Sequence, residues 1–214
     1  MRLISTIISW IFLPLFMPVL ALLIVFYAPS SITYCFQEDC LYSLYPETKN
    51  GVLILFAILT IVAPGLSLLF LRTQGIINSI EMETSQERNI PIIIMFLYAI
   101  ALFVFLWFKS PEGYFPKYLF SLPLSGILVT FTFFWLNRWD KVSIHAGSVG
   151  ILVGFLLAYM IHHGNLPVWP LVLSLGISGI VISARLYLGK HTLRQVGVGW
   201  GVGLLITFIT NILY

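Results

Sequence analysis

The chain has 214 residues, of which 59% are hydrophobic and 9% are charged, and its mean hydropathy is +1.00. Because about a quarter of the residues in an average soluble domain are charged, this composition excludes a water-soluble enzyme, a nucleic-acid-binding protein and a disordered tail. The formal net charge of +3 is too small to indicate a polyanionic partner. We therefore expect an all-α integral membrane protein, a polytopic bundle of about six to seven transmembrane helices.

The predicted spans follow from the length of the apolar segments, because a bilayer core needs about 20 residues per helix. The first segment, residues 3–27, is longer than the apolar region of a signal peptide and lacks a small-residue cleavage site, so we expect a retained anchor. Residues 142–184 contain no Asp, Glu, Lys or Arg and form two spans, divided by the polar turn at 162–167. The other predicted spans are 51–71, 118–136, 195–213 and 92–108, the last being short enough to be tilted or partly re-entrant.

The charged loops predict the orientation of the chain. Seven spans put the two termini on opposite faces, and most of the 11 Lys and Arg residues then share the N-terminal face: Arg2, Arg72, Arg88, Arg138, Lys141, Arg185, Lys190 and Arg194. By the positive-inside rule this face is cytoplasmic, unless several of these arginines are retained for chemistry. Cys35 and Cys40 lie in the first loop of the opposite face, where a disulfide could form in an oxidising compartment; two unpaired thiols are the alternative.

Three polar clusters lie at span ends on the N-terminal face: Arg88; then Lys141, Ser143 and His145; then Arg185 and His191. Ionisable residues in a membrane are costly and indicate a functional site by default. Two histidines with three cations suit an anionic group such as phosphate. The remaining cations of this face are instead typical of side chains that reach the lipid headgroups.

Glycines recur at helical spacing in the last three predicted spans: Gly147, Gly150, Gly154, Gly176, Gly179, Gly197, Gly199, Gly201 and Gly203. Small residues at such spacing allow transmembrane helices to approach closely. We therefore expect the fifth to seventh spans to pack tightly against one another.

The three clusters together resemble the signatures of the type-2 phosphatidic acid phosphatase superfamily, over about residues 88–203. The third signature of that family, Ser-Arg, five residues, His, three residues, Asp, is matched by Arg185 and His191, with Gln195 at the Asp position. The second, Pro-Ser-Gly-His, is matched by Ser143 and His145 in the order Val-Ser-Ile-His. The first, Lys, six residues, Arg-Pro, is matched by Arg88 and, three residues later, Pro91, with Glu81 at the Lys position. We accordingly divide the chain into N-terminal transmembrane helices, 1–72, and a phosphatase-like transmembrane core, 73–214.

The resemblance implies a lipid phosphatase that needs neither a metal nor a cofactor. His191 would attack phosphorus to give a phosphohistidine, and His145 would protonate the leaving oxygen and later activate water. Arg88 and Arg185 would hold the phosphate oxygens where charge builds in the transition state. Ser143 would donate a further hydrogen bond, and Lys141 either replaces the missing Lys of the first signature or anchors the chain at the interface.

Gln195 is the main departure from the family pattern. The family Asp accepts the Nδ1–H of the nucleophilic histidine and stabilises its cationic form, whereas an amide oxygen accepts the hydrogen bond without supplying charge. Two outcomes remain open. The protein is an enzyme that draws a carboxylate from elsewhere, such as Asp140 or Glu87, or it is a fold that binds lipid phosphates and hydrolyses them poorly.

The predicted substrate is a membrane lipid phosphate or pyrophosphate of the phosphatidate, phosphatidylglycerophosphate or polyprenyl diphosphate class. The alternative is a non-catalytic lipid-phosphate binding or transport protein, and a purely structural protein would tolerate replacement of His145 and His191. We expect a multi-pass protein of a bacterial inner membrane. Its loop charges favour a site on the cytoplasmic face, whereas the analogy with bacterial members of the family favours the outer face. The sequence does not indicate an oligomeric state.

Overall fold

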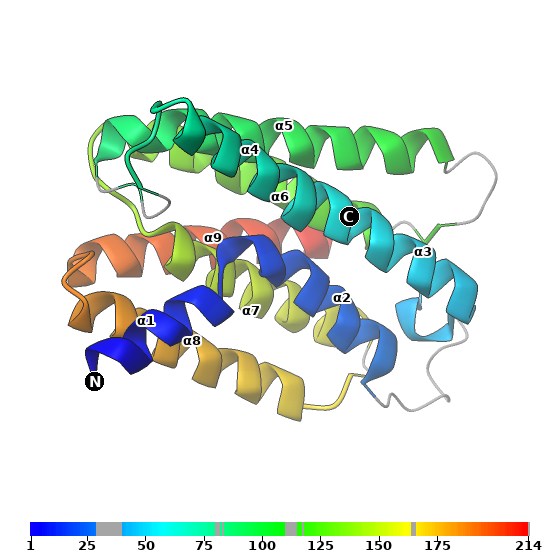
Figure 1. Ribbon diagram of the computed structural model, residues 1–214. Coiled ribbons are helices and arrows are strands. Elements are labelled where there is room, and N and C mark those ends of the chain that lie inside the picture. The colour runs from blue at the N-terminus through cyan, green and yellow to red at the C-terminus, as the bar shows by residue number, and fades with distance from the viewer. Residues whose placement is uncertain are drawn as a thin grey trace.

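The protein, in its computed structural model, is a bundle of long helices that run up and down between two ends (Figure 1). The structure describes residues 1–28, 40–79, 82, 84–109, 115–116, 118–163 and 166–213. Cys35 and Glu81 lie outside the described residues. The described residues contain no strand, and seven helical segments are long and apolar enough to cross a membrane. The predicted all-α polytopic fold is therefore confirmed.

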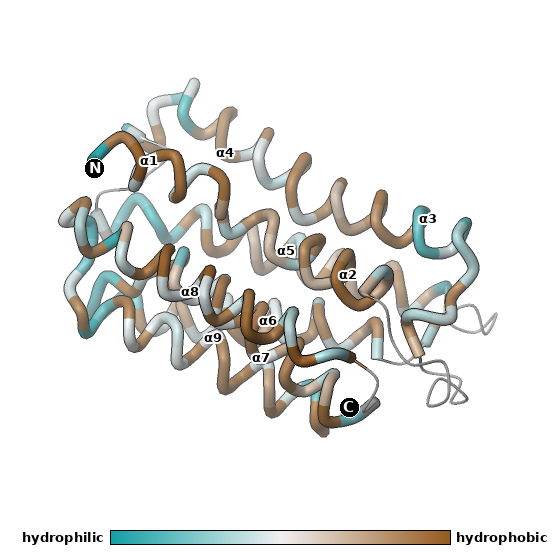
Figure 2. Tube along the Cα trace, turned by 90° about the horizontal axis from the view of Figure 1, so that it is seen from below, coloured by the Kyte–Doolittle hydropathy of each residue, from teal (hydrophilic) through white to brown (hydrophobic). Residues whose placement is uncertain are grey.

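The helices, in chain order, are α1 Arg2–Ile11, η1 Pro14–Phe16, α2 Met17–Tyr27, η3 Leu41–Ser43, α3 Pro46–Ala57, the π-helical segment η4 Ile58–Val62, α4 Ala63–Thr73, α5 Ser85–Lys109, α6 Tyr118–Leu136, α7 Ile144–His163, α8 Trp169–Tyr187 and α9 Leu193–Leu213. The first span combines α1, η1 and α2, and the second combines α3, η4 and α4. Hydrophobic residues follow the helices along their length, and hydrophilic residues gather at the two ends of the bundle (Figure 2).

The first span is a broken helix, not the continuous one that its hydropathy predicts. Pro14 starts η1, and Pro18 lies in the first turn of α2. Proline lacks a backbone N–H and its ring clashes with the preceding turn, so Pro14 and Pro18 are each accommodated at the start of a new helical segment and interrupt the hydrogen bonds of the one before. The break sends α1 against α8, whereas α2 packs on α3 and α7.

Two other predicted spans differ in detail from the structure. The third span begins at Ser85 as the 25-residue helix α5, so it is long enough to cross the bilayer without being re-entrant, and Arg88 lies in its first turn. The second span begins at Pro46 and contains the π-helical segment η4 just before Pro64. Such segments are rare and occur mostly as single wide turns within α-helices, frequently at functional sites.

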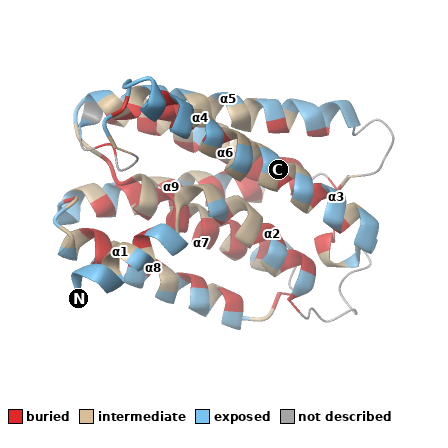
Figure 3. Cartoon of the chain, in the orientation of Figure 1, coloured by how far each residue is buried: buried red, intermediate tan, exposed pale blue. Residues whose placement is uncertain are grey.

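Helix α7 is the centre of the bundle and contacts α2, α6, α8 and α9 (Figure 3). It approaches α9 backbone to backbone: a Cβ on Gly150 would collide with the Trp200 carbonyl, and one on Gly203 with the backbone of Gly147. The predicted tight packing of glycines is thus confirmed for α7 and α9. It is wrong for Gly176 and Gly179 of α8 and for Gly197 and Gly201 of α9, which have no neighbour within 4 Å of an added Cβ.

At the opposite end, Lys49 is a structural residue rather than a loop charge. Its Nζ donates hydrogen bonds to the carbonyls of Phe26, at 2.9 Å, and Tyr42, at 2.7 Å, and the side chain is 8% exposed. It thereby satisfies a carbonyl that the end of α2 leaves without a helical partner. Cys40, which lies near Lys49, is disulfide-bonded, and its predicted partner Cys35 lies outside the described residues.

Candidate active site

The candidate site lies at the end of the bundle that holds the N-terminus, where the α4–α5, α6–α7 and α8–α9 connections meet (Figure 1). Four of the predicted residues line one cavity of about 220 Å³: Arg88 of α5, His145 of α7, Arg185 of α8 and His191 of the α8–α9 connection. Residues from four separate places in the sequence thus converge as predicted. Residues of α1, η1, α4 and α5 close the cavity with apolar side chains, and no acidic residue is found among the described residues that line it.

Arg88 is 3% exposed and is held in position by two backbone carbonyls. Its Nε donates to the Met82 carbonyl and its Nη1 to the Val142 carbonyl, both at 2.9 Å. Met82 has a φ of 50°, a left-handed conformation that is uncommon outside glycine and is found at functional sites. No sequence pattern predicted this role of Met82, which also lines the cavity.

His191 is 8% exposed, and its Nδ1 lies 3.2 Å from the Lys141 carbonyl oxygen. A carbonyl only accepts hydrogen bonds, so Nδ1 must carry the proton, and the neutral ring then has its lone pair on Nε2. Burial, followed by the positive charges of Arg88, Arg185 and Lys141, lowers the pKa of His191 to about 4, against a weaker opposing effect of Gln195. The ring is therefore neutral at pH 7, with Nε2 available as a nucleophile or a base.

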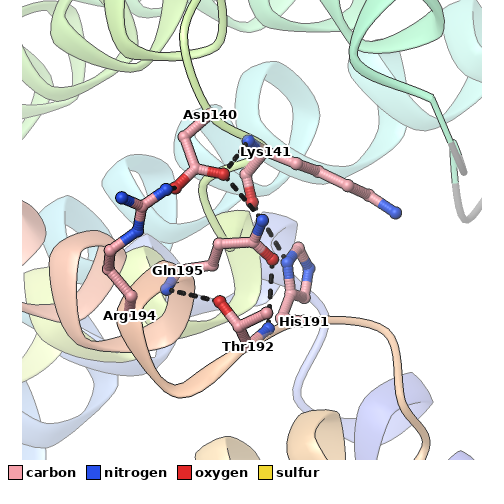
Figure 4. A network of polar contacts seen from close by, with 6 residues as sticks. All are labelled: Asp140, Lys141, His191, Thr192, Arg194 and Gln195. Carbon is pink, nitrogen blue, oxygen red and sulfur yellow. Dashed lines mark hydrogen bonds and ion pairs between the residues drawn. The ribbon is translucent and has the colours of Figure 1, made fainter.

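Gln195 joins the start of α9 to the α6–α7 connection (Figure 4). Its Oε1 accepts from the Thr192 N–H at 3.1 Å, and its own N–H donates to Thr192 Oγ1 at 3.3 Å. These reciprocal bonds form a capping box, and the spacing Thr-x-x-Gln at 192–195 is a sequence signature that predicts it. Its Nε2 donates to Asp140 Oδ1 at 2.7 Å. The Lys141 carbonyl is thus the hydrogen-bond partner of His191 Nδ1, and the Gln195 side chain lies beside the same ring and acts on it more weakly.

Asp140 supplies the carboxylate nearest to this network. Its Oδ1 also accepts from the Lys141 N–H at 2.8 Å, and its Oδ2 pairs with Arg194 at 2.6 Å. The bond from Gln195, then those from Lys141 and Arg194, lower the pKa of Asp140. Glu87, the other carboxylate considered from the sequence, is bonded instead by Asn78. The carboxylate thus acts on His191 only through Gln195 and the Lys141 backbone.

Ser143 and Lys141 support the site without lining the cavity. Ser143 is fully buried, and its Oγ accepts from the Ala146 N–H at 3.4 Å, which caps the start of α7. Its own N–H donates to the Gln195 carbonyl at 3.3 Å. The backbone of 140–143 is thereby fixed against α9, and direct contact of Ser143 or Lys141 with a ligand stays a prediction.

Helix α1 also reaches the site, which the sequence did not indicate. The backbone of Ser9 lies close to the His145 ring, and Trp10 lines the cavity. Ser9 is buried, whereas Leu3, Ile4, Ile7 and Ile11 are exposed. The apolar face of α1 is therefore directed outwards, toward lipid in a membrane, and its polar face toward His145.

Among the described residues, no three His, Cys, Asp or Glu side chains come together as a metal-ligand set. The donor groups of the cavity are instead two guanidinium groups and two imidazoles, which suit an oxyanion. In comparisons with known proteins, no protein-family model, curated protein or solved structure matches the chain.

Proposed function

We propose that this protein hydrolyses a membrane-anchored lipid phosphate or pyrophosphate through a phosphohistidine at His191. The observation that carries the proposal is the convergence of Arg88, Arg185, His145 and His191 on one anion-sized cavity at the end of seven membrane-spanning segments. A headgroup at this depth stays at the interface while its hydrocarbon tail stays within the membrane. The residue order and spacing that resemble the type-2 phosphatidic acid phosphatases support the same function.

The proposed chemistry has two steps. In the first, Nε2 of His191 attacks phosphorus, the bond from phosphorus to the leaving oxygen breaks, and His145 gives that oxygen a proton. In the second, His145 removes a proton from water, whose oxygen displaces His191 and releases phosphate. Arg88 and Arg185 hold the three equatorial oxygens in both steps, where negative charge is greatest.

Three features of the site support His191 as the nucleophile. The Lys141 carbonyl selects the tautomer with a free Nε2, and the depressed pKa keeps the ring unprotonated at neutral pH. The capping box of Thr192 and Gln195 fixes the helix that begins directly after His191. The interaction with a neutral carbonyl stabilises the imidazolium less than a carboxylate does, so turnover is expected to be slower than with an aspartate at residue 195.

Phosphate release by the purified protein tests this proposal. The protein in lipid nanodiscs would be given phosphatidate, phosphatidylglycerophosphate and polyprenyl diphosphate, each with and without a chelator. We expect release that persists with chelator and is lost in His191→Ala, while Arg72→Gln, an exposed cation outside the cavity, keeps wild-type activity. Release that survives in His191→Ala would overturn the proposal.

A second candidate function is lipid-phosphate binding or transport without turnover. The neutral partner of Nδ1 favours it, because the cation formed on attack receives little stabilisation. Lipid phosphate would then bind to wild type and lose affinity in Arg185→Gln, without any phosphate being released. Replacing Gln195 by Asp would raise hydrolysis of a weakened enzyme and leave a pure binding protein inactive.

We also propose that the site end faces the cytoplasm of a bacterial cell. The cations Arg72, Arg138 and Arg194 are exposed at this end, and the disulfide-bonded Cys40 lies at the other. Single cysteines at Thr73, on the site end, and Tyr45, on the opposite end, are both exposed probes. In intact cells only Tyr45→Cys should react with an impermeant thiol reagent, and reaction of Thr73→Cys alone would reverse the orientation.

A further inference from the structure

A second cavity, of about 120 Å³, lies beside the cationic one and is bounded by all of the first five spans. The two cavities share four wall residues, namely Pro14, Leu15, Met95 and Ile144. The second cavity extends from these toward Phe56 of α3 and Leu122 of α6, away from the site end. The described residues of its walls carry no charged side chain. The cavity that holds the cationic groups and the apolar cavity are therefore adjacent and share part of their walls.

The irregular parts of the first two spans border this second cavity. Pro14 and Pro18 at the break between α1 and α2 line it, as do Leu59 and Thr60 of the π-helical segment. The same cavity is lined by Gly126 of α6, which has no side chain, and by Ala99 of α5, which has a single methyl group. Protein interiors are normally packed as densely as organic crystals, so straight helices with larger residues would fill this space. Two backbone irregularities and two small residues leave it open instead.

From these shared walls we infer that the second cavity binds a single hydrocarbon chain of the lipid whose phosphate occupies the cationic cavity. The inference rests on the proposed function and adds to it a substrate class, lipids with a slender chain that enters the bundle directly below the phosphate. The chain leaves one apolar environment for another, so its binding gains little from the hydrophobic effect. Its affinity comes from van der Waals contact with the cavity walls, which depends on the shape and length of the chain.

Selectivity for chain length tests the inference. The probes are ethyl phosphate, whose two carbons should leave the second cavity empty, and dodecyl phosphate, whose chain should extend into it. In the wild type, kcat/KM should be higher for dodecyl phosphate than for ethyl phosphate. Ala99→Phe places a ring in the second cavity and should lower kcat/KM for dodecyl phosphate by about tenfold or more, as for a lost apolar contact in a pocket. Ethyl phosphate should be hydrolysed as in the wild type.

The matched control is Ala101→Phe, the same substitution on the same helix at an exposed position outside the cavity. It should leave both substrates unaffected. A milder pair covers the case in which Ala99→Phe does not fold. Gly126→Ala brings a methyl group to 3.6 Å from the Ala99 Cβ, an ordinary contact, whereas Gly176→Ala meets nothing within 4 Å. Equal loss for both substrates, or no loss for dodecyl phosphate in Ala99→Phe and Gly126→Ala, would overturn the inference.

A binding experiment that does not depend on hydrolysis distinguishes failure of the inference from failure of the proposed function. If neither phosphate is hydrolysed by the wild type, the enzymatic proposal fails, and the cavity is tested with dodecyl phosphate that carries a photoreactive diazirine at the end of its chain. Labelling confined to α3, η4, α5 and α6, and lost in Ala99→Phe, would support the chain site. Labelling spread over the outer surface of the bundle in both proteins would overturn it.

Discussion

The α7–α9 pair and the first two spans differ in how closely they pack. Helices α7 and α9 are regular, and glycines bring their backbones into direct contact at Gly147 and Gly203. The first two spans are interrupted, by prolines at 14 and 18 and by the π-helical segment Ile58–Val62, and cavities lie along them. The difference teaches that the close-packed pair holds His145 and, at the start of α9, the connection that carries His191, whereas the irregular spans leave room for a ligand.

The largest effect is expected where the rigid pair is forced apart. In Gly203→Ala the new Cβ falls on the backbone of Gly147, so α7 and α9 must separate. Overpacking of this kind costs about 1–3 kcal/mol, and the shift also displaces His145 and His191 relative to each other. Thermal unfolding in detergent should show a lower Tm, together with loss of phosphate release. Gly176→Ala, on the open face of α8, is the control and should match the wild type; equal Tm values for all three proteins would contradict close packing as the fixing element.

A smaller effect on activity is expected from replacing Asp140, whose carboxylate is linked to His191 only through Gln195 and the Lys141 backbone. In Asp140→Asn the charge-assisted bonds from Gln195 and Arg194 are weakened. Because Asp140 does not line the cavity, kcat should fall by about tenfold, the scale of one such bond, with KM unchanged. Arg194→Gln removes the ion-pair partner of Asp140. Because the Arg194 side chain is 77% exposed and its ion pair is weakened by solvent, kcat should change much less. A change in KM alone would show that Asp140 acts on ligand binding instead.

The smallest expected effect is a shift in pH dependence. The pKa of His191 is about 4, below the ordinary value of 6.5, and the reactive form is the neutral one. The His191-dependent step should thus be insensitive to pH between about 5 and 7 and be lost as pH falls through about 4. Lys141→Gln removes one of the charges that lower this pKa, so the acid limb of the kcat profile should move to higher pH. Arg72→Gln should not move it, and an acid limb near 6.5 in the wild type would show that His191 is not held in this environment.

Much of the fold and of the site could be predicted from the sequence, because hydropathy and charge report directly on membrane crossing. The seven spans follow from segment length, and the common face of Arg88, His145, Arg185 and His191 follows from the number of crossings between them. The break at Pro14 and the π-helical segment before Pro64 could not be predicted in this way, because hydropathy averages over backbone geometry. Because the second cavity depends on these two irregularities, it could not be predicted from hydropathy either.

Other features could be identified only from the structure or from local sequence patterns. Only the structure shows that the carbonyl of Lys141, a residue known from the sequence as a cation, orients His191. The glycines of α8 have the same kind of spacing as those of α7, but no neighbour lies within 4 Å of a Cβ added to them. Spacing shows that residues share a helix face, but it does not show which element packs against that face. The capping box of Thr192 and Gln195, in contrast, has a recognisable sequence pattern. It gives the glutamine at residue 195 a structural role at the start of α9.

The central claim, that His191 is a nucleophile in a cavity built for lipid phosphates, is tested most directly by trapping the covalent intermediate. The wild type and His191→Asn would be mixed with radiolabelled phosphatidate or polyprenyl diphosphate and quenched under alkaline conditions, and the modified peptide identified by mass spectrometry. We expect phosphate on His191 that is stable to base and labile to acid, and none in His191→Asn. Phosphate release without any label on His191 would contradict the account, as would a label that persists in His191→Asn.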